Sequence, residues 1–391
     1  MARKHSSPIY LDYAATTPMH PDVVHAMAAF LDKRFYNPSS PYAAAQDVKK
    51  DIEAARKGIA HWLGAKATEI IFTAGGTEAN NLAIHGVMSQ FPDANLIVSA
   101  IEHESVLEPA ALYNRKLAPV DVNGIVKLEA LESLIDDSTV LVSIMYANNE
   151  IGTIQPMPEI ARVIKRVRKQ RLQRAIKTPL YLHTDAAQAA TLLDLHVDRL
   201  GIDLMMLNGS KMYGPKQVGC LYIKTDIHLA SLIQGGGQER GLRSGTENVA
   251  GIIGLATALG RAQSVRKETS DREAALIDSM LKVLVEDVPD IRVNGSRAHR
   301  LSSNLSLTIP GVDGERLVLE LDEQGVQAAT GSACSANRDT RSHVLIALGL
   351  SEDEVDASLR ITVGEPTGRS EAIQAARLIA ATVKRMRRKA K

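Results

Sequence analysis

The sequence predicts an α/β fold built around a mainly parallel β-sheet. Short apolar runs alternate with segments of helical periodicity, which is typical of strands joined by helices. Several apolar runs stop at a polar or glycine-rich cluster, and ligands bind at such strand ends in open α/β sheets. At 391 residues the chain exceeds one typical hydrophobic core, so we expect more than one domain.

Six apolar runs predict the strands of this sheet. They cover residues 69–73, 95–100, 140–146, 180–184, 204–207 and 219–224. Residues 265–288 alternate polar and apolar residues in a way that predicts a helix leaving the sheet. Beyond that helix the pattern is more mixed and predicts strands at 304–309 and 359–363 and a last helix at 371–388. This change of pattern places a domain boundary near Gln263.

The composition is that of an ordinary globular protein. Hydrophobic residues make up 45% of the chain and charged residues 23%, and the formal net charge is +1. This charge gives no overall attraction to nucleic acid or to a membrane surface. We expect neither a membrane span nor a secretory signal, because no apolar run is long enough for the first and none follows the basic N-terminus. Two cysteines without a signal favour a reducing compartment, so a cytoplasmic protein is expected.

The two cysteines lie in different surroundings. Cys334 lies among small residues in the run ATGSACSAN at 329–337, where an uncrowded thiol suits a nucleophile. A small hydrophobic residue at a strand end is the alternative, and this run alone does not decide between them. Cys220 lies in a β-rich apolar run, where burial raises the thiol pKa, so it is predicted to be structural. No CxxC pair or clustered His-Cys spacing indicates a metal site.

Three polar clusters follow predicted strands. A Gly-Gly-Thr turn at 75–77 opens a helix, and its N–H groups with the Thr77 hydroxyl suit a phosphate, although a plain turn has the same pattern. Asp185 ends a buried strand and needs a cationic partner or strong donors; a pyridinium nitrogen is one such partner, and a helix cap is the alternative. Lys211 follows another strand among small residues, where a lysine either forms an imine or is simply solvated.

Together these clusters fit one cofactor, pyridoxal phosphate. It requires a phosphate cradle, an acid against its ring nitrogen, an imine lysine and usually a flat group over the ring. Thr77, Asp185, Lys211 and His103 can supply these in turn. Each signal is weak alone, but the four occur after successive strands and support one another.

A set of motifs along nearly the whole chain carries a more specific resemblance. The motifs are YLDYAATTP at 10–18, NPSS at 37–40, TAGGTEANN at 73–81, NNEIG at 148–152, DAAQ at 185–188, GGGQERG at 235–241, RSGT at 243–246, GSAC at 331–334 and SLRIT at 358–362. With these motifs the chain resembles the class V aminotransferase group of pyridoxal-phosphate enzymes, and within it the cysteine desulfurases of the NifS and IscS type.

The resemblance implies a fold and an assembly. It implies the fold type I of pyridoxal-phosphate transferases, with a mainly parallel seven-stranded sheet in a large domain and a smaller α+β C-terminal domain. The large, cofactor-binding domain would span 16–262, and 1–15 with 263–391 would form the small domain that carries the cysteine loop. The resemblance also implies a homodimer whose active sites lie at the subunit interface.

The resemblance further implies roles for individual residues. Lys211 would hold the cofactor, Asp185 would pair with its ring nitrogen, and His103 would stack on the ring and take part in proton transfer. Asn149 and Gln188 would address the phenolic oxygen of the ring. The phosphate would be held by Gly76, Thr77, Asn208 and Ser210, with Thr246 from the other subunit.

The implied reaction converts L-cysteine to L-alanine. Arg360 would clamp the substrate carboxylate together with Asn149, a task suited to its planar fork of donors. Cys334 would attack the substrate sulfur and carry it as a persulfide to an acceptor protein, for iron-sulfur cluster assembly or tRNA thiolation. An iron-sulfur cluster would touch Cys334 only transiently. A selenocysteine lyase or another aminotransferase-like enzyme is the alternative, and a non-catalytic scaffold that binds sulfur acceptors is a third.

The chain departs from the family pattern at several positions. Ser210 stands where these enzymes usually carry histidine before the lysine, and the effect of this change on cofactor binding is left open. The segment 162–177 holds eight basic residues and no acidic one, and the C-terminus is also basic. We interpret the basic segment as a solvated helix face rather than a contact for tRNA or an acidic protein. Residues 338–341 also differ in type from the usual ones, so the sequence does not identify the sulfur acceptor.

Overall fold

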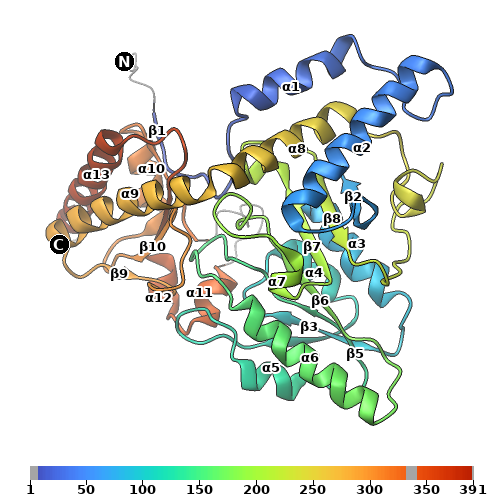
Figure 1. Cartoon of the computed structure of the whole chain (residues 1–391). Helices are drawn as coiled ribbons and strands as arrows, with labels where there is room; N and C mark the ends of the chain where they lie inside the picture. The colour runs from blue at the N-terminus through green and yellow to red at the C-terminus, as the bar shows by residue number, and fades with distance from the viewer. Residues whose placement is uncertain (1–7, 332–340, 390–391) are drawn as a thin grey trace.

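The computed structural model describes residues 8–331 and 341–389, and its larger part is built around a seven-stranded sheet (Figure 1). In spatial order the strands are β2 (Ile70–Thr73), β8 (Gly219–Ile223), β7 (Leu204–Asn208), β6 (Tyr181–Asp185), β5 (Thr139–Ser143), β3 (Asn95–Ser99) and β4 (Asn114–Ala118). Strand β8 runs antiparallel to both of its neighbours, whereas the other neighbouring pairs are parallel. The predicted mainly parallel α/β fold is therefore confirmed.

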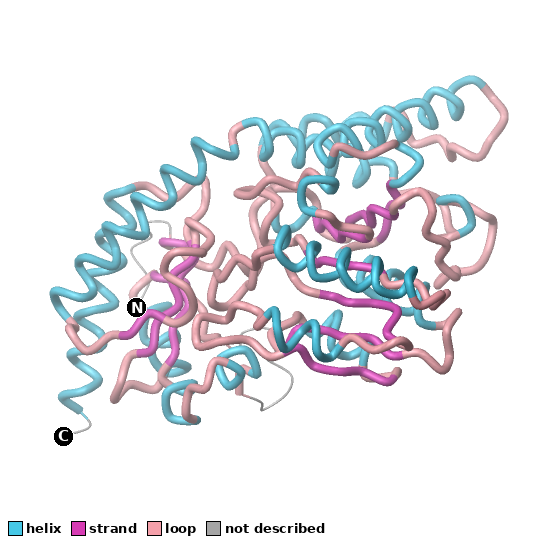
Figure 2. Tube along the Cα trace, turned by 60° about the horizontal axis from the view of Figure 1, so that its bottom comes forward, coloured by secondary structure: helices cyan, strands magenta, loops and turns pink. Residues whose placement is uncertain are grey.

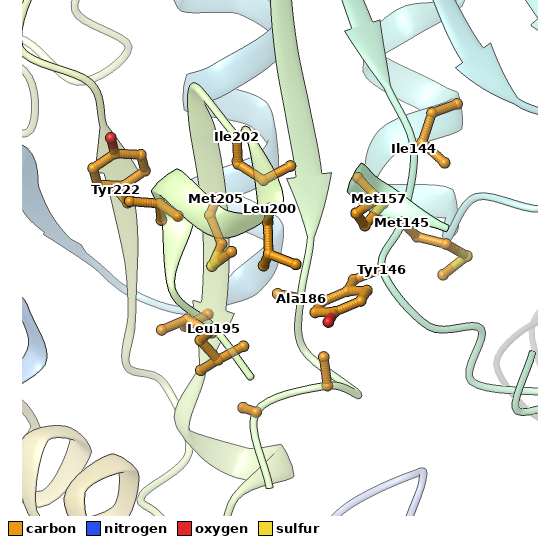
Figure 3. Close-up of a cluster of buried hydrophobic side chains, with 14 of the residues drawn as sticks. Ile144, Met145, Tyr146, Met157, Ala186, Leu195, Leu200, Ile202, Met205 and Tyr222 are labelled. Carbon is orange, nitrogen blue, oxygen red and sulfur yellow. The ribbon is translucent and has the colours of Figure 1, made fainter. Parts of the chain in front are cut away.

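Helices cover both faces of this sheet, so that the larger part has three layers (Figures 1 and 2). One face carries α3 (Gly76–Met88) and α4 (Glu104–Ala110). The other face carries α2 (Ala43–Leu63), α5 (Leu128–Leu134), α6 (Met157–Gln173), α7 (Val197–Leu200) and α8 (Val249–Ser264). Helix α1 (Pro21–Asp32) packs on α8. Figure 3 shows part of the core on this second face, to which Tyr146, Leu195, Leu200, Ile202 and Met205 belong.

The residues after α8 form a smaller body with its own core. Its antiparallel sheet has the order β12 (Ser358–Thr362), β10 (Asn304–Thr308) and β9 (Arg292–Val293). Helices α9 (Arg266–Asp287), α10 (Gly314–Asp322) and α13 (Arg369–Lys389) pack with this sheet. Strand β1 (Ile9–Tyr10) pairs with β11 (Val326–Gln327), and Leu11 joins the same core, so the first described strand lies with the C-terminal elements. The predicted domain limits stay a prediction.

The connecting elements are short. Helices α11 (His343–Ala347) and α12 (Glu352–Asp356) send Val344, Leu345 and Val355 into the core of the larger part. The described residues also include three turns of 3₁₀-helix: η1 (Ala67–Glu69), η2 (Gly209–Lys211) and η3 (Glu239–Gly241). Among the described residues, none of the helices is long and apolar enough to cross a membrane.

The six predicted strands of the large sheet are all found, but one of its strands was not predicted. Strand β4 has the sequence NRKLA and lies at the edge of the sheet, where its side chains are largely exposed and leave no apolar run. The predicted strand at 140–146 ends as β5 at Ser143. Beyond Ser143 the N–H groups of Ile144 and Tyr146 still donate to carbonyl oxygens of β6, so the chain stays extended in a less regular form.

The basic segment at 162–177 is held to the rest of the chain through its arginines. Four of them form ion pairs: Arg162 with Glu159, Arg166 with Glu132, Arg168 with Asp203 and Arg174 with Asp137. Arg171 is buried and donates to four backbone carbonyl oxygens. These contacts favour a structural role for the arginines over contact with tRNA or an acidic protein. Basic side chains of the last helix also form ion pairs: Lys384 with Asp287, Arg385 with Glu320 and Arg387 with Asp290.

Candidate functional site

The carboxyl ends of five strands meet at one edge of the large sheet. Strand β2 runs parallel to β7, because both are antiparallel to β8 between them. The ends of β2, β7, β6, β5 and β3 therefore point the same way, and each is followed by one or more of the predicted site residues. This is the edge at which ligands bind in open α/β sheets.

The predicted phosphate cradle lies between β2 and α3. Gly75 precedes the helix with a φ of 142°, a conformation that glycine adopts without strain. A Cβ on Gly76 would come within 3.0 Å of the Met206 side chain and 3.3 Å of the Asn208 Cβ, so a larger residue there would require these side chains to shift. Gly76, Thr77, Asn208 and Ser210 line one pocket of about 600 Å³, as does Lys216. The N-terminus of α3 thus presents backbone N–H groups and hydroxyls suited to a phosphate.

Asp185 is buried at the end of β6, with each carboxylate oxygen held by a donor. Oδ1 accepts from the Ala187 N–H at 2.9 Å, and Oδ2 accepts from Asn80 Nδ2 at 2.9 Å. The first bond resembles a helix cap, which is the alternative role that the sequence suggests for Asp185. The second comes from a fully buried asparagine of α3 that sequence reasoning did not single out. The two bonds fix the orientation of the carboxylate at the end of β6.

His103 lies at the N-cap of α4, and burial lowers its pKa. Its Nδ1 accepts the Ser105 N–H at 3.0 Å, so the ring is neutral with its proton on Nε2. The Ser105 hydroxyl lies 2.8 Å from the same nitrogen and also accepts from Asn80 Nδ2 at 2.9 Å. Asn80 and Ser105 therefore connect His103 with Asp185.

Lys211 follows β7 in η2 and points to the N-terminal segment of the chain. Its Nζ donates to the carbonyl oxygens of Ala14 at 3.0 Å and Ala15 at 2.5 Å. Gln188 Nε2 also donates to the Ala14 carbonyl oxygen, at 3.0 Å, so these two predicted site residues share one acceptor.

Arg360 lies in β12 of the smaller sheet and is 1% exposed. Its guanidinium donates to Asp12 Oδ1 at 2.7 Å and to the backbone oxygen of Asn149 at 3.3 Å. Its Nε is buried and has no hydrogen-bond partner among the described residues. A buried unpaired donor is costly, so the fork is suited to an added carboxylate. Asp12 was not assigned a role from the sequence.

Two buried carboxyl groups beside these residues were also not predicted. Burial raises the pKa of Glu150 to about 7, and its Oε2 accepts from the Ser342 hydroxyl at 2.5 Å. Burial raises the pKa of Glu102 well above its usual range, and Oε1 accepts from the Met145 N–H at 2.5 Å. Glu102 Oε2 has no partner in the part of the chain that the structure describes. In the sequence Glu102 and Glu150 stand next to the predicted site residues His103 and Asn149. Their burial, however, depends on segments that are distant in the chain.

Of three further residues considered in the sequence, the structure describes Thr246 and Cys220 but not Cys334. Thr246 is exposed and does not line the phosphate pocket formed by its own chain. Cys334 lies outside the described residues, between Gly331 and Arg341. Cys220 is fully buried, and burial raises its pKa to about 12, so the prediction of an inert structural cysteine is confirmed.

The residues present fit pyridoxal phosphate. Gly76 and Thr77 line a pocket at the start of α3, Asp185 is buried and held by two hydrogen-bond donors, and Lys211 lies at the same edge of the sheet. Each of these groups meets one requirement of the cofactor: a phosphate cradle, a partner for the ring nitrogen and an amine.

Comparison with known proteins identifies the family. The model of the aminotransferase class-V family matches residues 9–361, and the chain belongs to this family of pyridoxal-phosphate enzymes. A cysteine desulfurase IscS from Dictyoglomus turgidum is 40% identical over 363 residues, covering 91% of this chain and 89% of that relative.

Solved structures agree with this membership. A NifS-like protein superimposes with a TM-score of 0.88 at 32% identity, over 96% of this chain and 99% of its own. A structure described as SspA in complex with cysteine has a TM-score of 0.78 at 32% identity, over 91% of this chain and 99% of its own. The expected pyridoxal-phosphate transferase fold is confirmed.

Proposed function

We propose that this protein is a pyridoxal-phosphate-dependent cysteine desulfurase. It converts L-cysteine to L-alanine and places the sulfur on Cys334 as a persulfide. The observation that carries the proposal is the grouping of Asp185, His103 and Lys211 beside a glycine cradle at one edge of the sheet. The similarity to IscS-type cysteine desulfurases over most of the chain supports the choice of reaction.

The chain offers a partner for each part of the cofactor. Lys211 would form the covalent link, and Asp185 would hold the ring nitrogen while Asn80 and the Ala187 N–H hold Asp185. Asn149 and Gln188 would contact the phenolic oxygen. The phosphate would be bound by Gly76, Thr77, Asn208 and Ser210. When bound, pyridoxal phosphate withdraws electrons from the substrate and so weakens bonds at its Cα and Cβ.

The remaining residues act on the substrate. Arg360 would bind the cysteine carboxylate through its guanidinium, where Nε is unpaired among the described residues. His103 is neutral and carries its proton on Nε2, so it can donate that proton to a leaving group and take one back. The Cys334 thiolate would take up the substrate sulfur. In sum, cysteine and the Cys334 thiol give alanine and a Cys334 persulfide, with no other oxidant or reductant.

Product analysis tests this proposal. With purified holoenzyme, L-cysteine and an added thiol reductant, we expect alanine and sulfide to form in equal amounts, because the reductant releases the sulfur from Cys334. Pyruvate and ammonia in place of alanine would contradict the proposal, as would transamination of cysteine without sulfide release.

We also propose that the enzyme is a homodimer with shared active sites. Large apolar side chains are exposed on α1 and the segment after it, with exposed fractions of 70% for Leu31, 68% for Phe35, 52% for Tyr42 and 48% for Val24. Such a group of exposed apolar residues is typical of a protein interface. Thr246, exposed in its own chain, would then reach the phosphate site of the partner.

Mixing two inactive variants tests this sharing of sites. If Thr246 acts across the interface, a heterodimer of Thr246→Ala and Lys211→Ala subunits has one site with both defects and one intact site. We therefore expect activity to reappear in heterodimers isolated with two affinity tags. If verified heterodimers stay as inactive as the parent homodimers, Thr246 does not act across the interface.

The remaining proposals concern the cellular compartment, the partner protein and the domain limits. We propose a cytoplasmic enzyme, because a free nucleophilic thiol needs a reducing compartment. Its partner would be a sulfur-acceptor protein, a scaffold for iron-sulfur clusters or a thiolation enzyme, without direct contact to nucleic acid. The large domain at 16–262 and the small domain formed by 1–15 and 263–391 are likewise proposed, and the separate core that joins Leu11 to α9 and α13 supports this division.

A further inference from the structure

Ser105 lies between two groups of the candidate site and has no role in the reaction proposed above. It belongs to the first turn of α4 and is 8% exposed. Its hydroxyl oxygen accepts one hydrogen of the Asn80 amide at 2.9 Å and lies 2.8 Å from Nδ1 of His103. Asn80 is fully buried and donates its other amide hydrogen to Asp185 Oδ2 at 2.9 Å. These four side chains form one continuous chain of hydrogen bonds.

Asp185 determines which way the Asn80 amide points. A carboxylate oxygen accepts hydrogen bonds, so the NH₂ group of Asn80, and not its oxygen, faces Asp185 Oδ2. Asn80 Oδ1 is buried and has no hydrogen-bond partner among the described residues, so no contact of that oxygen favours the opposite orientation. Because Asn80 Nδ2 is a donor only and both of its hydrogens are used, it cannot accept the hydroxyl hydrogen of Ser105.

The Ser105 hydroxyl hydrogen is therefore available for His103. Of the groups that contact this hydroxyl in the described part of the chain, Nδ1 of His103 is the one that can accept a hydrogen bond. The Ser105 N–H donates to the same nitrogen at 3.0 Å. Two donors thus point at Nδ1, which stays unprotonated and leaves the ring proton on Nε2.

Charged groups on neighbouring elements also act on His103. Asp185 on β6 and Glu104 on α4 raise its pKa, whereas Lys211 in η2 and His343 on α11 lower it. Burial has the largest effect, and the pKa is lowered overall. These influences act on the charge of the whole ring, whereas the two donors at Nδ1 select the nitrogen that carries the proton.

We propose that Ser105 is a positioning residue whose hydroxyl keeps His103 neutral with its proton on Nε2. Asp185 sets the direction of this hydroxyl through Asn80, so the carboxylate assigned to the cofactor ring also controls the proton of His103. In this form Nε2 can donate a proton and later take one back, while Nδ1 stays occupied. The use of this form in the reaction rests on the proposed role of His103, whereas the tautomer is a property of the cofactor-free chain.

Nitrogen NMR of the histidine rings tests the proposal. Full-length cofactor-free protein is labelled with isotope-enriched histidine, and His103 is identified among the eleven histidines by the loss of its resonances in His103→Gln. We expect the wild type to carry the proton on Nε2. In Ser105→Ala we expect the midpoint of ring protonation to rise by about 0.5 to 1 pH unit, because the neutral ring loses one hydrogen bond.

A matched pair of variants separates the hydroxyl from the packing. Ser105→Thr and Ser105→Val have nearly the same shape and differ in the hydroxyl, so we expect Ser105→Thr to stay near the wild type and Ser105→Val to shift like Ser105→Ala. Ser133→Ala, at an exposed serine of α5, should leave the His103 midpoint unchanged.

Three results would overturn the inference. They are a wild-type ring with its proton on Nδ1, an unchanged or lowered midpoint in Ser105→Ala, and equal midpoints in Ser105→Thr and Ser105→Val, which would indicate packing. A wild type that fails to bind pyridoxal phosphate contradicts the proposed function instead, and it leaves these measurements on the cofactor-free chain valid.

Discussion

Replacement of Lys211 by alanine is expected to remove the visible absorption band of the bound cofactor and to lower desulfurase activity by at least about a thousandfold. Lys211 lies in η2, directly after the end of β7, at the edge of the sheet where the strands have their carboxyl ends. Asn208, three residues before it, lines the phosphate pocket. Without it no covalent link to the cofactor can form. Absorbance spectra of reconstituted protein, recorded with the activity, measure both effects.

The matched control for this variant is Lys216→Ala. Lys216 lines the phosphate pocket and is a lysine near Lys211 in the sequence, so it is the natural competitor for the cofactor. We expect Lys216→Ala to keep the band. Borohydride reduction of the wild type should then attach the cofactor permanently to the Lys211 side chain, which peptide mapping can locate. Cofactor fixed on Lys216, or a visible band that survives in Lys211→Ala, would contradict the assignment.

Cys334→Ser should lose sulfide release from cysteine by about a thousandfold or more while keeping the cofactor band. The hydroxyl of serine is nearly isosteric with the thiol, but it is too weakly acidic to act as the sulfur acceptor. Binding of the cofactor should persist, because the proposed contacts of Lys211, Asp185 and Gly76 do not involve residue 334. Sulfide assays with and without reductant, beside absorbance spectra, measure the two effects separately.

Cys220→Ser is the matched control for this second variant. Cys220 is fully buried with a raised pKa, so it cannot serve as a second acceptor, and its replacement should leave sulfide release within a few-fold of the wild type. Near wild-type sulfide release by Cys334→Ser would exclude the persulfide mechanism. Loss with cysteine but retention with selenocysteine would instead favour a selenocysteine lyase.

The sequence predicted most of the fold because most strands of the large sheet are buried. A strand buried on both faces is a short apolar run, and the six predicted strands have this character. Strand β4 lies at the edge and shows polar residues to the solvent, so its pairing with β3 leaves no signal in its own sequence. The two-residue strands β1, β9 and β11 are likewise set by their partners rather than by local pattern.

The candidate site was predicted in its principal residues but not in its supporting ones. Asp185 and Lys211 follow apolar runs, and this position at a strand end is visible in the sequence. Asn80 lies within a helix, where a polar residue usually faces solvent, and its burial depends on contacts with segments far away in the chain. The pairing of Arg360 with Asp12 joins residues 348 positions apart, a contact that only the folded chain creates.

The basic segment illustrates the same limit. Eight basic residues without an acidic one could equally form a binding surface or a solvated helix face. In the structure Arg166 and Arg174 pair with carboxylates outside the segment while their side chains stay largely exposed, and Arg171 donates to backbone carbonyl oxygens. The acidic partners lie outside the segment, so its local composition did not reveal them.

Mass analysis of Cys334 after one turnover tests the central claim most directly. The holoenzyme is incubated with L-cysteine in the absence of reductant, excess substrate is removed, and the peptides that carry Cys334 and Cys220 are analysed by mass spectrometry. The account predicts the added mass of one sulfur atom on the Cys334 peptide, its loss on treatment with a thiol reductant, and an unmodified Cys220 peptide. An unmodified Cys334 peptide in protein that has formed alanine would contradict it.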